Sequence, residues 1–142
     1  MCILSVIVPS YNVEKYLKTN LSSFDDERFN ELLEILIVND GSTDSTVSIA
    51  QEFVKKNPSV FKLINKENGG HGSAVNVGIS SASGKYFRVV DGDDWVNTEN
   101  LLKLLEYLKS VDFDLICDVK REIDFRTHNS LLFPLPKCVE KN

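Results

Sequence analysis

Residues 84–96 read GKYFRVVDGDDWV, and this stretch decides the fold. Its first part, Tyr86–Val90, is rich in β-branched and aromatic side chains, a composition typical of a buried strand. Asp91, Asp93 and Asp94 follow that strand directly. Carboxylates this close repel one another unless a positive group lies among them. The stretch therefore predicts a strand that delivers an acidic cluster to a binding site.

The rest of the chain alternates short apolar runs with helical patterns. Strands are expected at 3–8, 35–38, 60–64, 86–90 and 113–117, and helices at about 13–24, 45–56, 72–81 and 98–109. Strands that are apolar on both faces and alternate with helices predict an α/β fold, in which a mostly parallel sheet lies between two helix layers (α/β/α). The pattern weakens after Lys120, so we expect a domain over 1–118 and an irregular tail over 119–142.

Composition excludes several classes of function. Hydrophobic residues make up 42% and charged residues 26% of the 142, an ordinary balance for one globular domain. The net charge is −5, and the absence of a basic stripe argues against nucleic-acid binding. No apolar run approaches the roughly 20 residues that span a bilayer. Cys2, Cys117 and Cys138 lack metal or redox spacing and are interpreted as reduced thiols of a cytosolic protein.

Polar clusters follow each of the first four predicted strands. Because the carboxyl ends of parallel strands meet at one edge of a sheet, and ligands bind there, these clusters are expected to converge. They are Pro9–Asn12, Asn39–Asp44, Glu67–Ser73 and Asp91–Asp94.

The ligand at this edge is predicted to be a diphosphate held through a divalent cation. The chain has no G-x-x-x-x-G-K-S/T loop, and Pro9–Asn12 stands where a G-x-G-x-x-G loop would follow the first strand. Mg²⁺ and Mn²⁺ commonly take one or two carboxylates together with substrate phosphates. Asp91 and Asp93 flank Gly92, which can turn the chain so that both reach one ion. The alternative is a solvated acidic turn that caps the next helix.

Two further segments offer contacts to a nucleotide. Asp40 is a candidate to accept hydrogen bonds from a base or ribose, or else to cap the following helix. Pro9 and Tyr11 would form a flat wall for a base, unless Tyr11 only packs against its neighbours.

The glycines at 69, 70 and 72 would let the backbone approach a ligand closely. The helix that follows them would favour anionic groups at its N-terminus. His71 lies among these glycines and is a candidate substrate contact. The alternative is a flexible turn in which His71 has no role.

Four motifs together resemble glycosyltransferase family 2, whose members have a GT-A fold. The resemblance covers roughly residues 3–117 and is most similar in type to bacterial enzymes that build cell-surface polysaccharide. The motifs are SVIVPSYN (Ser5–Asn12), EILIVNDGSTD (Glu34–Asp44), NGGHGSAVNVG (Asn68–Gly78) and the stretch from Gly84 to Asp94.

The resemblance implies a nucleotide-sugar-binding domain over 1–118 and inverting transfer from a UDP-sugar to an acceptor hydroxyl. Asp40 would bind the uracil, and a general base would deprotonate the acceptor. A bound Mn²⁺ or Mg²⁺ would stabilise the departing diphosphate. The nucleotide-binding set implied is Pro9, Tyr11, Asn12, Asp40, Asp91 and Gly92; the sugar and phosphate loop is Gly69, Gly70 and His71; the metal ligands are Asp91, Asp93 and Asp94.

Two departures from the family pattern limit what is carried over. Val75 stands where many members have a basic residue, and nothing after Cys117 aligns with the half that brings the acceptor site and the catalytic base. We therefore assign no catalytic base, and expect nucleotide binding with weak or absent sugar transfer. A sheet without its later strands would leave an exposed edge, which predicts self-association or limited solubility.

The expected partners are the nucleotide sugar and a saccharide or lipid-linked acceptor. A cytoplasmic protein is expected, and a lipid-linked acceptor would place it at the inner face of the membrane. Two other functions stay open: a non-catalytic nucleotide-sugar-binding module and a sugar nucleotidyltransferase. The second usually has a basic, glycine-rich loop where Pro9–Asn12 lies.

Overall fold

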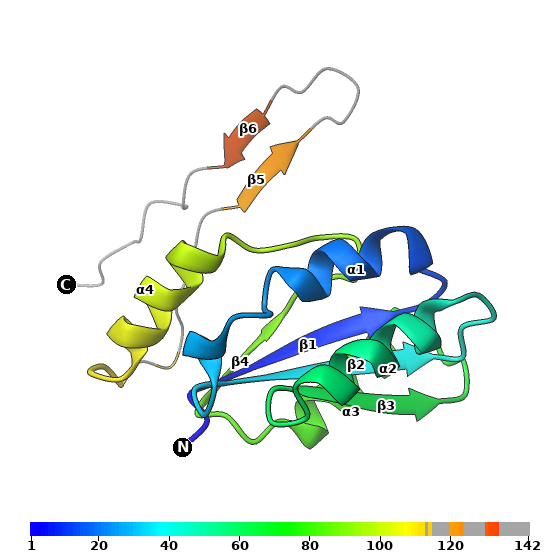
Figure 1. Cartoon of the computed structure of the whole chain (residues 1–142), viewed down its shortest axis with the longest axis horizontal. Helices are drawn as coiled ribbons and strands as arrows, with labels where there is room; N and C mark the ends of the chain where they lie inside the picture. The colour runs from blue at the N-terminus through cyan, green and yellow to red at the C-terminus, as the bar shows by residue number, and fades with distance from the viewer. Residues whose placement is uncertain (113, 115–119, 124–129, 134–142) are drawn as a thin grey trace. The chain divides into compact units, whose positions relative to one another are not determined.

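The computed structural model describes residues 1–112, 114, 120–123 and 130–133 (Figure 1). The chain divides into two compact units, Met1–Ser110 and Val111–Asn142. The expected strand at 113–117 lies outside the described residues apart from Asp114.

The first unit contains a four-stranded sheet in which all described pairings are parallel, as predicted. The strand order is β3-β2-β1-β4, so β1 lies between β2 and β4. In this register Ile7 of β1 pairs with Leu36 on one side and Val89 on the other. The carboxyl ends of these strands therefore point to the same edge. The strands are β1 (Leu4–Ser10), β2 (Leu33–Asp40), β3 (Phe61–Lys66) and β4 (Tyr86–Val89).

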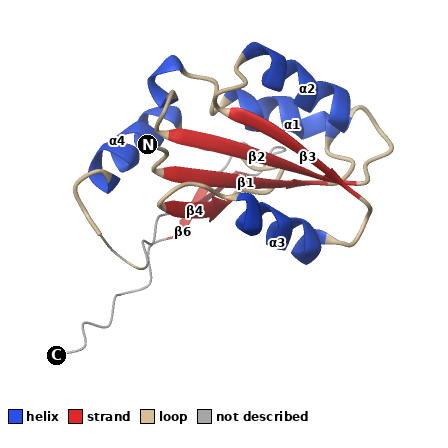
Figure 2. Ribbon diagram, turned by 90° about the horizontal axis from the view of Figure 1, so that it is seen from below, coloured by secondary structure: helices blue, strands red, loops and turns tan. Residues whose placement is uncertain are grey.

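Helices cover both faces of this sheet. Figure 2 shows α1 and α2 on one side and α3 on the other, so the α/β/α arrangement is confirmed. The helices are α1 (Glu14–Ser22), α2 (Thr46–Lys56), α3 (His71–Ser81) and α4 (Thr98–Leu108), with a short 3₁₀ helix η1 at Glu27–Phe29.

The contact of α3 with the sheet requires a glycine. A Cβ atom built on Gly78 would lie 2.3 Å from Cγ2 of Ile7 in β1, far inside any allowed contact. Ile7 forms a buried cluster with Leu36, Val38 and Ala74, the last from α3. The missing side chain thus lets α3 lie close enough to the sheet for its N-terminus to reach the edge where the strands end.

Two predictions about strands need correction. The strand from Tyr86 was expected to be buried, but Phe87 is 54% exposed because β4 pairs only with β1 among the described strands. Regular structure also occurs in the segment 119–142, which was expected to be irregular. There β5 (Lys120–Ile123) and β6 (Ser130–Phe133) pair in antiparallel fashion. The sequence of β5, KREI, is mostly charged and therefore lacks the apolar run from which the other strands were predicted.

A buried carboxylate fixes the start of β4. Glu34 in β2 is 3% exposed, and its oxygens accept hydrogen bonds from Ser5 Oγ (2.6 Å), Lys62 Nζ (2.6 Å) and the backbone N–H of Ser83 (2.6 Å). Ser5 Oγ in turn accepts from the N–H of Gly84 at 2.8 Å. Glu34 therefore ties three strands to the segment that leads into β4.

This network holds Glu34 in its charged form. Burial alone would raise the pKa of Glu34, but the hydrogen bonds from Lys62, Ser5 and Ser83 outweigh it and lower the pKa from 4.5 to about 2. The charged carboxylate stabilises the fold above pH 4.5, and this contribution is lost as the pH falls toward 2.

We predict that Glu34→Gln lowers the free energy of unfolding by about 2 kcal/mol at neutral pH, because the ion pair with Lys62 is lost. The variant should also show a flatter fall in stability between pH 4.5 and 2. Urea denaturation at a series of pH values measures both effects. Glu52→Gln, an exposed change in α2, is the control. Parallel pH profiles for wild type and Glu34→Gln would contradict the assignment.

Candidate functional site

A cavity of about 440 Å³ opens where the loops after β1, β2 and β4 meet the N-terminus of α3. Most of the residues predicted from the sequence lie around it, although they come from four separate segments. Of the predicted set, Asn12, Gly69 and Asp94 do not line it. Those that do are Pro9, Tyr11, Asp40, Gly70, His71, Asp91, Gly92 and Asp93.

Asp40 joins the end of β2 to the glycine-rich loop. It is 3% exposed. Its Oδ1 accepts from Lys66 Nζ (2.5 Å) and from the N–H of Gly69 (2.9 Å), and Oδ2 accepts from the N–H of Gly70 (2.8 Å). The hydrogen bond from Lys66 lowers the pKa of Asp40, and the two glycine N–H groups lower it further against the opposing effect of burial. The contact with Lys66 was not predicted, because it is made between two paired strands, β2 and β3.

The loop after β1 is tied to the loop after β2. Asn12 has φ +51°, and its Oδ1 accepts from the N–H of Thr43 at 2.8 Å. Its own N–H donates to Ser42 Oγ at 3.1 Å. Asn12, predicted to bind the nucleotide, thus shapes the loop that carries Tyr11, whose side chain is half exposed.

Side chains at the starts of α1 and α2 accept hydrogen bonds from each other's first N–H groups. The N–H of Glu14 donates to Asp44 Oδ2 (3.2 Å), while the N–H of Ser45 donates to Glu14 Oε2 (2.9 Å). The N–H of Val13 also donates to Thr46 Oγ1 at 3.0 Å. Each helix therefore satisfies N–H groups at the start of the other, a role that N-cap side chains usually fill within one helix.

The acidic residues after β4 form a tight turn. The N–H of Asp94 donates to the carbonyl of Asp91 at 2.9 Å, and Gly92 is buried against Val13 and Pro9. The carboxylates of Asp91 and Asp93 are exposed and line the cavity. The turn and the exposure of both carboxylates to the cavity are thus observed, and a single ion shared by them stays a prediction.

The glycine-rich loop brings α3 to the opposite wall. Gly70 precedes the helix with φ +87°, a conformation that favours glycine. His71 begins the helix and is 65% exposed, with Nε2 at 3.8 Å from Asp91 Oδ1. The N-terminus of α3 thus presents free N–H groups and partial positive charge near the acidic turn, an arrangement that suits a bound anion.

The donor set fits a divalent cation that is shared with a ligand. Among the residues that the structure describes, no cluster of three or more His, Cys, Asp or Glu side chains could enclose a metal ion. Asp91 and Asp93 offer hard oxygen ligands on one turn, and Mg²⁺ or Mn²⁺ characteristically completes such a pair with phosphate oxygens and water. The residues present would therefore hold the ion together with a diphosphate.

One residue near this site was missed by the sequence analysis. Asn20 of α1 is fully buried, and its Nδ2 donates to the carbonyls of Asp91 (3.0 Å) and Asp94 (2.8 Å). The available signal was an amide on the apolar stripe of a helix, between Leu17 and Leu21. A polar group at such a position is rarely buried without hydrogen-bond partners.

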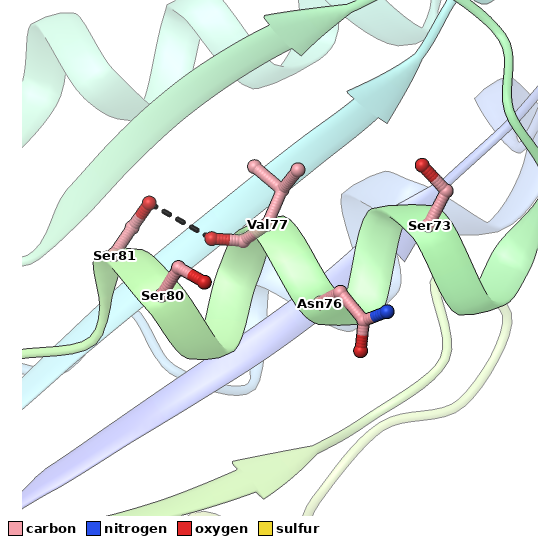
Figure 3. A pocket seen from close by; sticks show the side chains of 5 residues that line it. All are labelled: Ser73, Asn76, Val77, Ser80 and Ser81. Carbon is pink, nitrogen blue, oxygen red and sulfur yellow. Dashed lines mark hydrogen bonds between the residues drawn. The ribbon is translucent and has the colours of Figure 1, made fainter.

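A second hollow, of about 520 Å³, lies along α3 (Figure 3). Its lining comes from this helix alone and carries no ionisable group. The hydroxyl of Ser81 donates a hydrogen bond to the carbonyl of Val77 at 2.9 Å. The hollow therefore offers little for catalysis. Its residues are Ser73, Asn76, Val77, Ser80 and Ser81.

No helix in the described part of the chain is both long and apolar enough to cross a membrane.

Comparison with known proteins links the chain to one family. The model of the family "Glycosyl transferase family 2" matches residues 5–132. The uncharacterized glycosyltransferase EpsJ of Bacillus subtilis (strain 168) is 35% identical over 128 residues, which cover 89% of this chain and 37% of that protein. This chain thus spans about a third of the length of that relative.

Solved structures agree with the sequence match. A crystal structure of Staphylococcus aureus TarS 1-349 in complex with UDP-GlcNAc gives a TM-score of 0.66 at 34% identity, and covers 75% of this chain and 31% of that one. The mannosyltransferase PcManGT from Pyrobaculum calidifontis, in complex with GDP-Man and Mn²⁺, gives a TM-score of 0.64 at 26% identity, over 74% of this chain and 32% of that one.

We predict that Asp40→Asn loosens the glycine-rich loop, because the amide group of Asn cannot accept all the hydrogen bonds that the carboxylate accepts. The free energy of unfolding should fall by about 1–3 kcal/mol, and the amide protons of Gly69 and Gly70 should exchange faster with solvent. Hydrogen exchange followed by NMR measures the second effect, with Glu52→Gln as the control. Unchanged exchange at both glycines would show that Asp40 does not hold this loop.

Proposed function

The chain belongs to glycosyl transferase family 2, and from this premise we propose that it binds a UDP-sugar together with Mn²⁺ or Mg²⁺. The reaction proposed is inverting transfer of the sugar to an acceptor hydroxyl in the synthesis of a polysaccharide. The observation that carries the proposal is the convergence of Asp40, the acidic turn and the N-terminus of α3 on one cavity.

The relatives support the class of donor and the use of a metal. The TarS fragment is described in complexes with UDP-GlcNAc and with UDP, and PcManGT in a complex with GDP-Man and Mn²⁺. The fold shared with these proteins covers about three quarters of this chain. A nucleotide diphosphate with a divalent cation is therefore the ligand we propose here.

The carboxylate of Asp40 has an acceptor position left with which to recognise the base. A carboxylate has about four lone-pair positions, two on each oxygen. Lys66 and Gly69 use both positions on Oδ1, and Gly70 uses one on Oδ2. One acceptor position remains, and the N3–H of uracil is a matching donor. Pro9 and Tyr11 would form the wall against which the ring lies.

The diphosphate would lie between the acidic turn and α3. Asp91 and Asp93, with Asp94 beside them, would hold the cation. Gly70 and His71 would face the phosphate and sugar from the opposite wall, and Gly69, which does not line the cavity, would support them through its hydrogen bond to Asp40. When bound, the cation would stabilise the negative charge that develops on the leaving diphosphate. The N–H groups at the start of α3 would contribute to the same stabilisation.

The acceptor and the general base are not assigned to residues of this chain. We propose a saccharide or lipid-linked acceptor, in the cytoplasm, where thiols such as that of Cys2 stay reduced. A non-catalytic nucleotide-sugar-binding module is the second candidate, because no residue in the described part of the chain is assigned as the general base. Family membership and the sequence after β1 both disfavour a sugar nucleotidyltransferase.

We predict that Mn²⁺ raises the affinity for UDP at least about tenfold, equivalent to roughly 1.4 kcal/mol, and that Asp93→Ala removes this gain. The reason is that one carboxylate cannot hold the ion as firmly as two. Calorimetric titration of UDP with and without Mn²⁺ measures the effect, and Glu52→Gln should behave like the wild type. Equal affinities with and without Mn²⁺ would refute the proposal; a transfer assay with UDP-sugars then separates an enzyme from a binding module.

We also predict that UDP binds at least about tenfold more tightly than CDP. Cytosine carries no hydrogen on N3, so it would leave the last acceptor position of Asp40 facing another acceptor, and a site built for a donor rejects ligands that lack it. Competition titrations with the two nucleotides give the ratio, which Asp40→Asn should reduce. A ratio near one in the wild type would exclude base recognition by Asp40.

A further inference from the structure

Asn20 clamps both ends of the acidic turn from a different element. The primary amide of Asn has two N–H donors, and here one Nδ2 atom bonds the carbonyls of Asp91 (3.0 Å) and Asp94 (2.8 Å). Both donors are therefore used. Among the described residues, the Oδ1 atom of Asn20 is buried without a hydrogen-bond partner. A flipped amide would place this oxygen against two carbonyl oxygens, so only one orientation is favourable.

Ser23, one turn further along, holds the segment after the turn. Its Oγ donates to the carbonyl of Asn20 (2.6 Å) and accepts from the N–H of Val96 (3.3 Å). The hydroxyl of Thr98 donates to the carbonyl of Ser23 at 2.9 Å. The end of α1 thus fixes the backbone from Asp91 to Thr98, the start of α4.

Packing alone does not account for an amide at this position. Asn20 lies between Leu17 and Leu21 on the buried face of α1, where a leucine would bury more apolar surface. An amide in this environment is costly unless it is hydrogen-bonded. The two N–H donors of the Asn20 amide make all of its side-chain hydrogen bonds in the described part of the chain, and both bonds go to the turn that carries Asp91 and Asp93.

From this geometry we infer that Asn20 is a positioning residue of the cation site, an inference that rests on the proposed function. Asp91 and Asp93 repel each other when no cation lies between them, and the repulsion tends to open the turn. The two hydrogen bonds from Asn20 hold the turn closed before any ligand arrives. The cation then finds its two carboxylates already in place, so less of its binding free energy is used to order them.

The test compares Asn20→Ala with Leu21→Ala, a truncation of the next residue, which is also fully buried. Asn20→Leu, which removes the donors but fills the space, serves if the alanine variant does not fold. Two quantities are measured on the full chain: hydrogen exchange of the Asp94 and Val96 amides without ligand, and the affinity for UDP with and without Mn²⁺.

We expect the Asn20 variants to exchange both amides at least about tenfold faster and to lose most of the Mn²⁺-dependent gain in UDP affinity, with metal-free affinity within about twofold of wild type. Leu21→Ala should change neither quantity beyond its loss of global stability. Unchanged exchange in the Asn20 variants, or an undiminished Mn²⁺ gain, overturns the inference. If the wild type itself shows no Mn²⁺ gain, the proposed function fails, and the exchange data alone decide whether Asn20 holds the turn.

Discussion

The contact between Gly78 and Ile7 is the constraint on which the arrangement of the site depends. The side chains of a helix normally keep it at a distance from the sheet that it covers, but α3 has no side chain at Gly78, which lies against Ile7 of β1. The helix axis is thereby set close to β1, the strand that also pairs with β2 and β4. Its N-terminus lines the same cavity as the turn after β4, and Nε2 of His71 lies 3.8 Å from Oδ1 of Asp91.

The carboxylates near the sheet fall into two kinds. Glu34 and Asp40 are buried, and each is neutralised by a lysine on β3, Lys62 and Lys66 respectively. Asp91 and Asp93 are exposed to solvent on the wall of the cavity. Buried charges need partners within the fold, because water cannot reach them. Exposed carboxylates need no partner within the fold, and they remain accessible to an ion from solution.

Much of the fold followed from local patterns. The parallel sheet, the helices on both faces and the convergence of four loops were predicted because apolar runs and helical stripes are signals within single segments. The exposure of Phe87 was not predicted, because the residue pattern of a strand does not show whether another strand or helix covers that strand. Lys66 and Asn20 were missed for a related reason: each acts on a segment at least 26 residues away in sequence.

The exchanged caps of α1 and α2 make the two loops beside the cavity a single cooperative unit. Glu14 and Asp44 each accept a hydrogen bond from an N–H at the start of the other helix, so displacement of either loop removes a hydrogen bond from both helix starts. Local opening of one loop would fray the other helix as well. A ligand that contacts only Tyr11 would therefore rigidify the stretch around Thr43, and the chain would gain order at residues that the ligand never touches.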